Sequence, residues 1–301
     1  MSSFSAQSTS EEVCQVLADH IKGSKVLITG VTLGSVGGEA ALQLSRHQPA
    51  LLVLAGRNLQ TLQATENAIK AETPDANTRL LILDLSSQES VRKAAAEVKL
   101  SGAHRSSHQQ RRHHGGTVHD YSRGSGTAKI ISGGSKVRVV NVSSAGHKRG
   151  PVRFDDVNFE NGKCYDKWQA YGQSKTANML FTVSLAEKAG EKGVESFSLY
   201  PGRRETGIGR HLKPEEWVMA GWKHEDGSIN DDPKLNWRTA SQGAATLIVA
   251  AYDPSISDKN GSYMVNNKVN NGEAVDYALD PKYAEKLWKL SEEIVGQKFG
   301  Y

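Results

Sequence analysis

The amino-acid sequence predicts an α/β fold in which a doubly wound parallel sheet has helices on both faces. Aliphatic runs at residues 25–29, 51–55 and 80–85 have the composition of strands, and helix-forming stretches separate them. Strands that alternate with helices form parallel sheets, because each crossover helix returns the chain to the same end of the sheet. At 301 residues and 38% hydrophobic content, the chain can bury one large core.

The first predicted strand runs into a glycine-rich turn and then into a helix. Thr29 and Gly30 close the strand, and Gly34 and Gly37 follow before the helical pattern begins. Glycines let the backbone approach a pyrophosphate, and the first turn of a helix offers unpaired N–H groups and the positive end of its dipole. The turn therefore predicts a dinucleotide phosphate site, although such a turn is a weak signal when it stands alone.

The second predicted strand ends next to Arg57, where a dinucleotide fold presents the adenosine ribose. An acidic residue there would select NAD(H), whereas a guanidinium fork suits a 2′-phosphate. Arg57 therefore favours NADP(H). The third strand ends near Asp84 and Leu85 and leads into a helix over residues 89–98, with Ser86 or Ser87 as its N-cap.

A second set of motifs carries candidate chemistry. A strand-like run ends at Ser144, and a later helix carries Tyr171 and Lys175. Residues four apart share one helix face, so the Lys175 ammonium is expected to lower the pKa of Tyr171 from its usual value of about 10. An isolated Tyr/Lys pair is more often an ordinary surface pair. Here it follows the other motifs in a consistent order.

Together these motifs resemble the short-chain dehydrogenase/reductase family, and in particular its retinol-dehydrogenase-like and WW-domain-oxidoreductase-like members. The resemblance covers about residues 22–100 and 136–301, and the glycine motif is one residue longer than the family pattern in its last step. It implies a single Rossmann-type domain. It also implies catalytic residues Ser144, Tyr171 and Lys175, and a cofactor site made of Thr29, Gly30, Gly34, Gly37, Arg57, Asp84, Leu85, Tyr171, Lys175, Pro201, Gly202 and Thr206.

The resemblance further implies an NADP(H)-dependent oxidoreductase that interconverts an alcohol and an aldehyde or ketone. Tyr171 would exchange a proton with the substrate oxygen, Ser144 would hydrogen-bond that oxygen, and Lys175 would hold the nicotinamide ribose. The alternative is a catalytically impaired relative that binds cofactor weakly or acts without catalysis.

That alternative arises because residues 101–135 depart from the family pattern. The family has there a strand ending in Asn-Asn-Ala-Gly and a helix with a catalytic Asn, whereas this stretch is rich in Gly, Ser and His and lacks apolar periodicity. Its composition predicts a loop or disorder. Metal binding by His104 and His108 is disfavoured because no acidic or cysteine ligand accompanies them. Nucleic-acid binding through Arg111 and Arg112 is disfavoured because aromatic residues are not interleaved.

A third interpretation is that this stretch is translated out of the family's reading frame. Residues 108–115 can be encoded CAT CAA CAA CGC CGG CAT CAT GGC, and removal of the first base yields Ile-Asn-Asn-Ala-Gly-Ile-Met-Ala. The shifted peptide contains the missing family motif. We therefore hypothesise that residues about 100–135 are out of frame, which predicts a disrupted strand–helix unit at the centre of the sheet.

Several segments outside the motifs allow more than one interpretation. Residues 1–21 are expected to form a polar extension before a domain of residues 22–301. Residues 203–240 contain Trp217, Trp222, Trp237 and Met219, which predict either a lid over an apolar substrate or ordinary core packing. His147 is interpreted as a solvated loop histidine. The stripe of Tyr283, Leu287, Leu290 and Ile294 predicts the buried face of a C-terminal helix over residues 281–295.

Composition narrows the cellular context and the partners. No run approaches the roughly 20 apolar residues of a membrane span, and Cys14 and Cys164 lie far apart in the sequence. The net charge of +4 is modest for this size. We expect a soluble, cytoplasmic protein without a metal or nucleic-acid partner. Its substrate is expected to be a small lipophilic carbonyl or alcohol, and the resemblance makes a homodimer possible.

Overall fold

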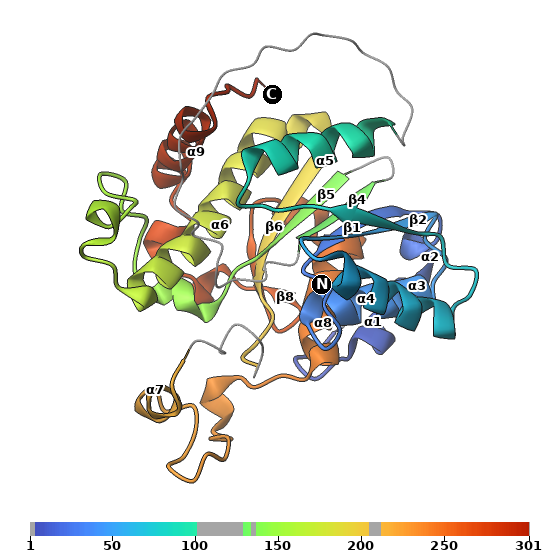
Figure 1. Cartoon of the computed structure of the whole chain (residues 1–301), viewed down its shortest axis with the longest axis horizontal. Helices are drawn as coiled ribbons and strands as arrows, with labels where there is room; N and C mark the ends of the chain where they lie inside the picture. The colour runs from blue at the N-terminus through green and yellow to red at the C-terminus, as the bar shows by residue number, and fades with distance from the viewer. Residues whose placement is uncertain (1–3, 101–128, 134–136, 205–211, 301) are drawn as a thin grey trace.

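The described part of the chain forms an eight-stranded sheet with strand order β3-β2-β1-β4-β5-β6-β7-β8. The computed structural model describes residues 4–100, 129–133, 137–204 and 212–300 (Figure 1). The strands are β1 Lys25–Thr29, β2 Leu51–Gly56, β3 Thr78–Ile82, β4 Lys129–Gly133, β5 Val137–Val142, β6 Val194–Tyr200, β7 Tyr263–Val265 and β8 Lys268–Val269. The helices are α1 Ser10–Val16, α2 Ala18–Ile21, α3 Val36–Ser45, α4 Leu59–Glu72, α5 Gln88–Leu100, α6 Lys167–Ala189, α7 Pro214–Met219, α8 Ala240–Tyr252 and α9 Pro281–Val295.

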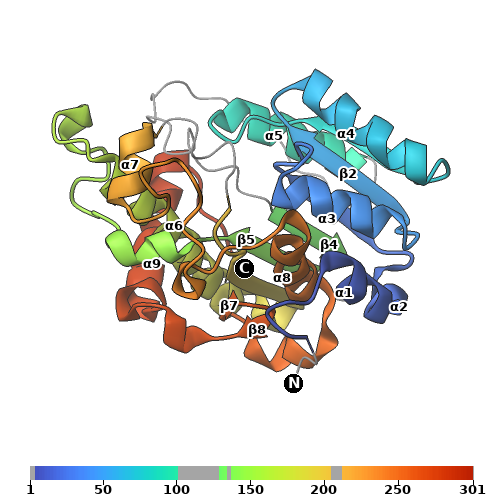
Figure 2. The same ribbon diagram turned by 90° about the horizontal axis from the view of Figure 1, so that it is seen from below.

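Helices cover both faces of this sheet. Figure 1 shows α5 and α6 on one side and α3 with α8 on the other, and Figure 2 shows α9 beside α6. Fully buried aliphatic and aromatic side chains from strands and helices, among them Ile28, Leu54, Phe197 and Leu247, fill one continuous core. Their burial removes apolar surface from water and holds the layers together. The predicted doubly wound α/β fold is confirmed.

The central strand runs opposite to its neighbours. β4 pairs antiparallel with both β1 and β5, whereas β1 with β2 and β5 with β6 are parallel pairs. Residues 134–136 are all that separate β4 from β5. A parallel pair needs a crossover of about a dozen residues or more, so this short connection dictates an antiparallel pair.

The strand β4 also corrects an expectation from composition. Residues 129–133 lie in the stretch predicted to be loop or disorder, yet they occupy the centre of the sheet. The prediction was wrong there because strand pairing on both sides satisfies the backbone of a short segment whatever its overall composition. Residues 101–128 lie outside the described residues. They include His104 and His108 and most of the stretch to which the out-of-frame hypothesis applies.

The N-terminal segment is part of the folded body. Residues 10–21, expected to belong to a polar extension, form α1 and α2, and Val13, Cys14 and Ile21 are fully buried in the main core. A capping box starts α1, because the Thr9 hydroxyl accepts from the Glu12 N–H and the Glu12 carboxylate accepts from the Thr9 N–H. Burial raises the pKa of the Cys14 thiol to about 12.

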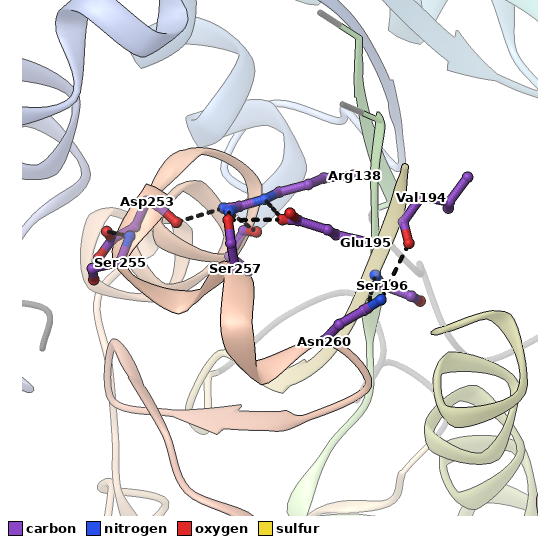
Figure 3. Close-up of polar contacts among 9 residues, drawn as sticks. Arg138, Val194, Glu195, Ser196, Asp253, Ser255, Ser257 and Asn260 are labelled. Atoms are coloured by element: carbon purple, nitrogen blue, oxygen red, sulfur yellow. Dashed lines mark hydrogen bonds and ion pairs between the residues drawn. The ribbon is translucent and has the colours of Figure 1, made fainter. Parts of the chain in front are cut away.

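A buried ion pair ties the sheet to the end of α8. Arg138 on β5 pairs with Glu195 on β6 at 2.7 Å, and both side chains are less than one tenth exposed (Figure 3). Arg138 also donates to the Asp253 carbonyl at 2.7 Å and to the Ser257 hydroxyl at 2.8 Å. Every arm of the guanidinium thus has an acceptor, which is the condition under which a buried charge is tolerated.

The C-terminal helix α9 has its predicted bounds but turns a different face inward. Ala284 and Trp288 are buried against α6, whereas Tyr283 and Ile294 are 41% and 42% exposed. The predicted stripe was therefore wrong at two of its four positions, because Trp288 stacks on Phe181 of α6 with the ring centroids 5.9 Å apart. None of the helices in the described ranges is long and apolar enough to span a membrane.

Candidate active site

The glycine-rich turn after β1 is tightly wound. Gly30 and Gly34 have φ of 70° and 76°, in the left-handed region that glycine adopts without strain. Ser35 caps α3 by accepting from the Gly38 N–H at 3.0 Å, and its hydroxyl donates to the Gly30 carbonyl at 2.8 Å. A Cβ on Gly37 would lie 2.6 Å from the Gly30 oxygen. A side chain at Gly37, in the first turn of α3, would therefore collide with the backbone of the glycine-rich turn.

Arg57 and Asp84 lie at the same edge of the sheet. β2 and β3 are parallel with Gly56 opposite Ile82, so the residues that follow each strand emerge side by side. Ser86 donates to the Asp84 carboxylate from its hydroxyl at 2.6 Å and from its N–H at 3.0 Å. These bonds, with the nearby charge of Arg57, hold the pKa of Asp84 below its usual range. Arg57 is exposed, as is Leu85 at 49%.

Ser144 follows the carboxyl end of β5. Its hydroxyl accepts from the Gly146 N–H at 3.0 Å and caps the short 3-10 helix Ala145–Arg149. The preceding Ser143 donates to the carbonyl of Lys175 at 2.8 Å, which fastens the end of β5 to α6. Two serines in succession thus place one hydroxyl in the site and use the other to anchor the backbone.

Tyr171 and Lys175 lie one turn apart on α6. The Tyr171 hydroxyl hydrogen-bonds the Ser144 side chain, and Lys175 Nζ lies 5.4 Å from the centre of the Tyr171 ring. A Cβ on Gly146 would lie 2.7 Å from Tyr171 Cδ1, so only glycine leaves space for the ring. The structure therefore brings together the three predicted catalytic side chains.

The electrostatics of this pair differ from expectation. Burial raises the pKa of Tyr171, and the hydrogen bond with Ser144 and the charges of Arg149 and Arg203 oppose that rise. Lys175 is 2% exposed, and burial lowers the pKa of its ammonium to about 8. The prediction that Lys175 lowers the pKa of Tyr171 was wrong for this structure, because desolvation of the phenol outweighs the neighbouring charges.

His147 is buried, which contradicts the prediction of a solvated loop residue. Its Nε2 accepts from the Val275 N–H at 3.3 Å, which leaves the proton on Nδ1 to be donated to the Ser144 carbonyl at 2.6 Å. The ring packs edge-on against Tyr263, with centroids 5.3 Å apart. Burial lowers the pKa of His147 below 6.5. The neutral ring therefore fixes the backbone of Ser144.

The loop after β6 approaches the glycine-rich turn. Gly202 has φ of 88°, and a Cβ there would overlap the side chain of Arg238. Arg204 donates from Nη2 to the Gly34 carbonyl at 3.0 Å, which links the two predicted cofactor segments. Pro201 is half-buried beside them. Thr206 lies outside the described residues.

The tryptophans of residues 203–240 are half-buried, and they pack on one another, on α6 and on Arg203. Trp217 and Trp222 are partly exposed and pack edge-to-face at 5.7 Å, and Trp222 packs in the same way on Trp168 of α6. Figure 1 shows α7 and the chain around it standing away from the sheet. Met219 is 87% exposed. The two alternatives for this segment, a lid over the substrate and core packing, both stay predictions.

Comparison with known proteins connects this geometry to a family. No protein-family model matches the chain. It is 37% identical over 163 residues to the short-chain dehydrogenase/reductase prx1 of Penicillium rubens, a match that spans 51% of this chain and 45% of the relative. The chain is thus similar to short-chain dehydrogenase/reductases over about half of its length. Human retinol dehydrogenase 13 is 27% identical over 92% of this chain and 86% of its own length.

Further matches define the limits of the likeness. A Streptomyces lividans oxidoreductase is 34% identical over 52% of this chain and 54% of its own length, so the chain spans about half the length of the first curated relatives that it matches. A solved structure from Mycobacterium paratuberculosis has a TM-score of 0.55 and 18% identity, with 90% of this chain and 93% of that chain covered. A 3-oxoacyl reductase of Agrobacterium tumefaciens, solved with NADP bound, has a TM-score of 0.52 and 17% identity, with 82% and 95% covered. At these identities both likenesses concern the fold alone.

Proposed function

We propose that this protein is an NADP(H)-dependent oxidoreductase that interconverts an alcohol and an aldehyde or ketone. The observation that carries the proposal is the convergence of Ser144, Tyr171 and Lys175 beside the glycine-rich turn. β1 and β5 both pair antiparallel with β4, so they run parallel to each other and their carboxyl ends share one edge of the sheet. Ligands of open α/β sheets bind at that edge.

The side chains of the site can donate the proton that such a reaction needs and stabilise the negative charge that develops. The raised pKa of Tyr171 keeps its hydroxyl protonated at neutral pH, so it can donate to a carbonyl oxygen. Ser144 hydrogen-bonds the same oxygen as negative charge develops on it. In the reverse direction, the oxidation of an alcohol, the deprotonated Tyr171 would accept the proton of the hydroxyl. The nicotinamide cofactor, when bound, supplies the hydride.

The residues present fit a dinucleotide of this kind. Gly30 and Gly34 adopt positive φ, and Gly37 has no space for a side chain at the start of α3, which suits a close approach of a pyrophosphate. Arg57 is exposed at the end of β2 with its charge near Asp84, where a 2′-phosphate can reach the guanidinium. The NADP bound to the Agrobacterium tumefaciens neighbour supports a nicotinamide cofactor. We propose that the cofactor site consists of Thr29, Gly30, Gly34, Gly37, Arg57, Asp84, Leu85, Tyr171, Lys175, Pro201, Gly202 and Thr206.

The Arg57→Leu variant tests the cofactor choice. Loss of a charge-assisted hydrogen bond costs about 1.5–3 kcal/mol, so the Kd for NADPH should rise roughly ten- to a hundred-fold while the Kd for NADH hardly changes. Arg46→Gln, which alters an exposed arginine paired with Glu72, is the matched control. Equal losses for both cofactors, or none, would count against NADP(H) selection by Arg57. Quenching of tryptophan fluorescence reports each Kd.

A second candidate function is a catalytically impaired relative that binds cofactor weakly. The antiparallel β4 favours it, because the family's parallel central strand is replaced at the edge where the cofactor would lie. Thermal stabilisation by NADPH without turnover on a broad carbonyl panel would support this candidate. Sequencing the spliced transcript across codons 95–140 would test the out-of-frame hypothesis.

Four further features remain predictions. They are a small lipophilic substrate, a homodimer, a cytoplasmic location and a single domain over residues 22–301.

A further inference from the structure

Two arginines and two tryptophans form a continuous layer near Tyr171, which we call the Arg–Trp layer. The Arg149 guanidinium lies over the Trp168 ring with Cζ 4.2 Å from its centre. Trp168 meets Trp222 edge-to-face at 5.7 Å, and the Arg203 guanidinium lies over Trp222 at 4.4 Å. The two cations therefore bracket a pair of indoles. Aromatic faces hold a guanidinium in place while leaving its edge free for an acceptor.

The Arg–Trp layer adjoins the reacting hydroxyl. Trp168 lies three residues before Tyr171 on α6, so both occupy the same helix face one turn apart. The charges of Arg149 and Arg203 both act on the Tyr171 phenol. Gly172 lets this arrangement form, because a Cβ there would lie 2.9 Å from Arg149 Cβ. A substrate carbonyl at Tyr171 would thus carry its next substituents toward the two guanidinium groups.

Among the described residues, the charges of this layer have no counter-ion. In the ranges that the structure describes, no carboxylate pairs with Arg149 or Arg203. Arg203 donates from Nε to the Leu235 carbonyl at 3.1 Å and hydrogen-bonds Tyr200, but its Nη1 is buried without an acceptor. An unsatisfied buried donor costs about 1–3 kcal/mol, and more when it carries charge. An anionic ligand would supply both the acceptor and the charge.

We propose that the Arg–Trp layer binds a carboxylate carried by the substrate, so that the substrate is an aldehyde, ketone or alcohol with an apolar body and an acidic group. The inference rests on the proposed function, and it replaces a purely lipophilic substrate with an amphipathic one. Arg203 grips the carboxylate from the inner side and the exposed Arg149 from the outer side, while the indoles cover the apolar body. Guanidinium forks match the planar geometry of a carboxylate.

The test uses 4-formylbenzoate and its methyl ester, in which a methyl group removes the negative charge of the carboxylate. Binding is followed by tryptophan fluorescence in the presence of NADP⁺, so that no aldehyde is reduced. The wild type should bind the acid about ten-fold more tightly than the ester, since a charge-assisted pair contributes about 1.5 kcal/mol or more. Arg203→Met should abolish this preference, and Arg203→Lys should restore part of it. Arg46→Gln, far from the layer, should keep the preference.

Two outcomes overturn the proposal: equal binding of acid and ester by the wild type, or an unchanged preference in Arg203→Met. If Arg203→Met does not fold, Arg149→Gln changes an exposed side chain and should reduce the preference roughly three-fold, because one of two cations remains. An unchanged preference in that variant would also overturn the proposal. Preferred binding of the acid without NADPH oxidation by any aldehyde would reject the oxidoreductase and retain the anion site.

Discussion

The imidazole of His147 donates through Nδ1 to the carbonyl oxygen of Ser144 over 2.6 Å. The same residue also serves as an acceptor, because its own carbonyl receives the Tyr277 hydroxyl at 2.8 Å. The ring is completely buried, and its second nitrogen accepts from Val275, far along the chain. His147 therefore joins Ser144 to the C-terminal part of the fold, and we propose that it positions Ser144.

Replacement of His147 by Gln should loosen Ser144 and lower kcat about ten-fold, with little change in the Kd for NADPH, because cofactor contacts are untouched. The pKa of His147 is lowered from 6.5 in the native state. Just below pH 6.5 the imidazole is therefore protonated in the unfolded chain but still neutral in the native chain. Wild-type unfolding free energy should therefore fall as pH drops below 6.5, and the variant should show a flatter profile. Urea unfolding between pH 5 and 7.5 measures this, and parallel profiles would contradict the assignment.

A Gly146→Ala substitution should displace the Tyr171 ring. The new Cβ would lie 2.7 Å from Cδ1, and Gly146 also supplies the N–H that Ser144 accepts. We expect a loss of about 1–3 kcal/mol of stability and a larger proportional loss of kcat than of cofactor binding. Gly150→Ala is the matched control, because no atom lies within 4 Å of a Cβ there. Similar kcat values for the two variants would refute the packing argument.

Lys175→Met should make the cofactor-free protein more stable. Lys175 is 2% exposed, and its pKa falls from 10.5 to about 8, so at neutral pH the fold bears an expensive buried charge. Removing it should raise the unfolding free energy by roughly 2–3 kcal/mol at pH 7. Between pH 8 and 10.5, Lys175 is deprotonated in the native state but still protonated in the unfolded state. The unfolding free energy of the wild type therefore rises with pH in this range, and the difference in unfolding free energy between the variant and the wild type becomes smaller. Calorimetric unfolding of both proteins from pH 7 to 10.5 measures this difference. A variant that is less stable than the wild type at pH 7 would contradict the prediction.

Local patterns made much of this fold predictable. Glycine spacing after β1, the Tyr171–Lys175 helix and the alternation of strands and helices are all properties of short segments, and each was found where expected. The capping box of Thr9 and Glu12 was also present in the sequence and would have located α1. The polar residues around this capping box made the start of α1 hard to recognise in the sequence.

The features that were missed depend on distant contacts. His147 is buried by Tyr263 and Val275, which no local pattern connects to it. The direction of β4 follows from its short connection to β5, and its place in the sheet follows from β1. The pKa of Tyr171 is set by the desolvation that the folded site imposes. Trp168 could have been found, because it lies three residues before Tyr171 on the same helix face.

The central claim, that Tyr171 donates the proton in an NADPH-dependent reduction, is tested most directly by comparing wild type with Tyr171→Phe. The measurement is NADPH oxidation at neutral pH with a panel of aldehydes and ketones, together with the Kd for NADPH. We expect wild-type turnover, a fall of roughly a hundred- to ten-thousand-fold in kcat for Tyr171→Phe, and an unchanged Kd. A variant with near wild-type kcat, or a wild type that binds NADPH and reduces nothing, would contradict the claim.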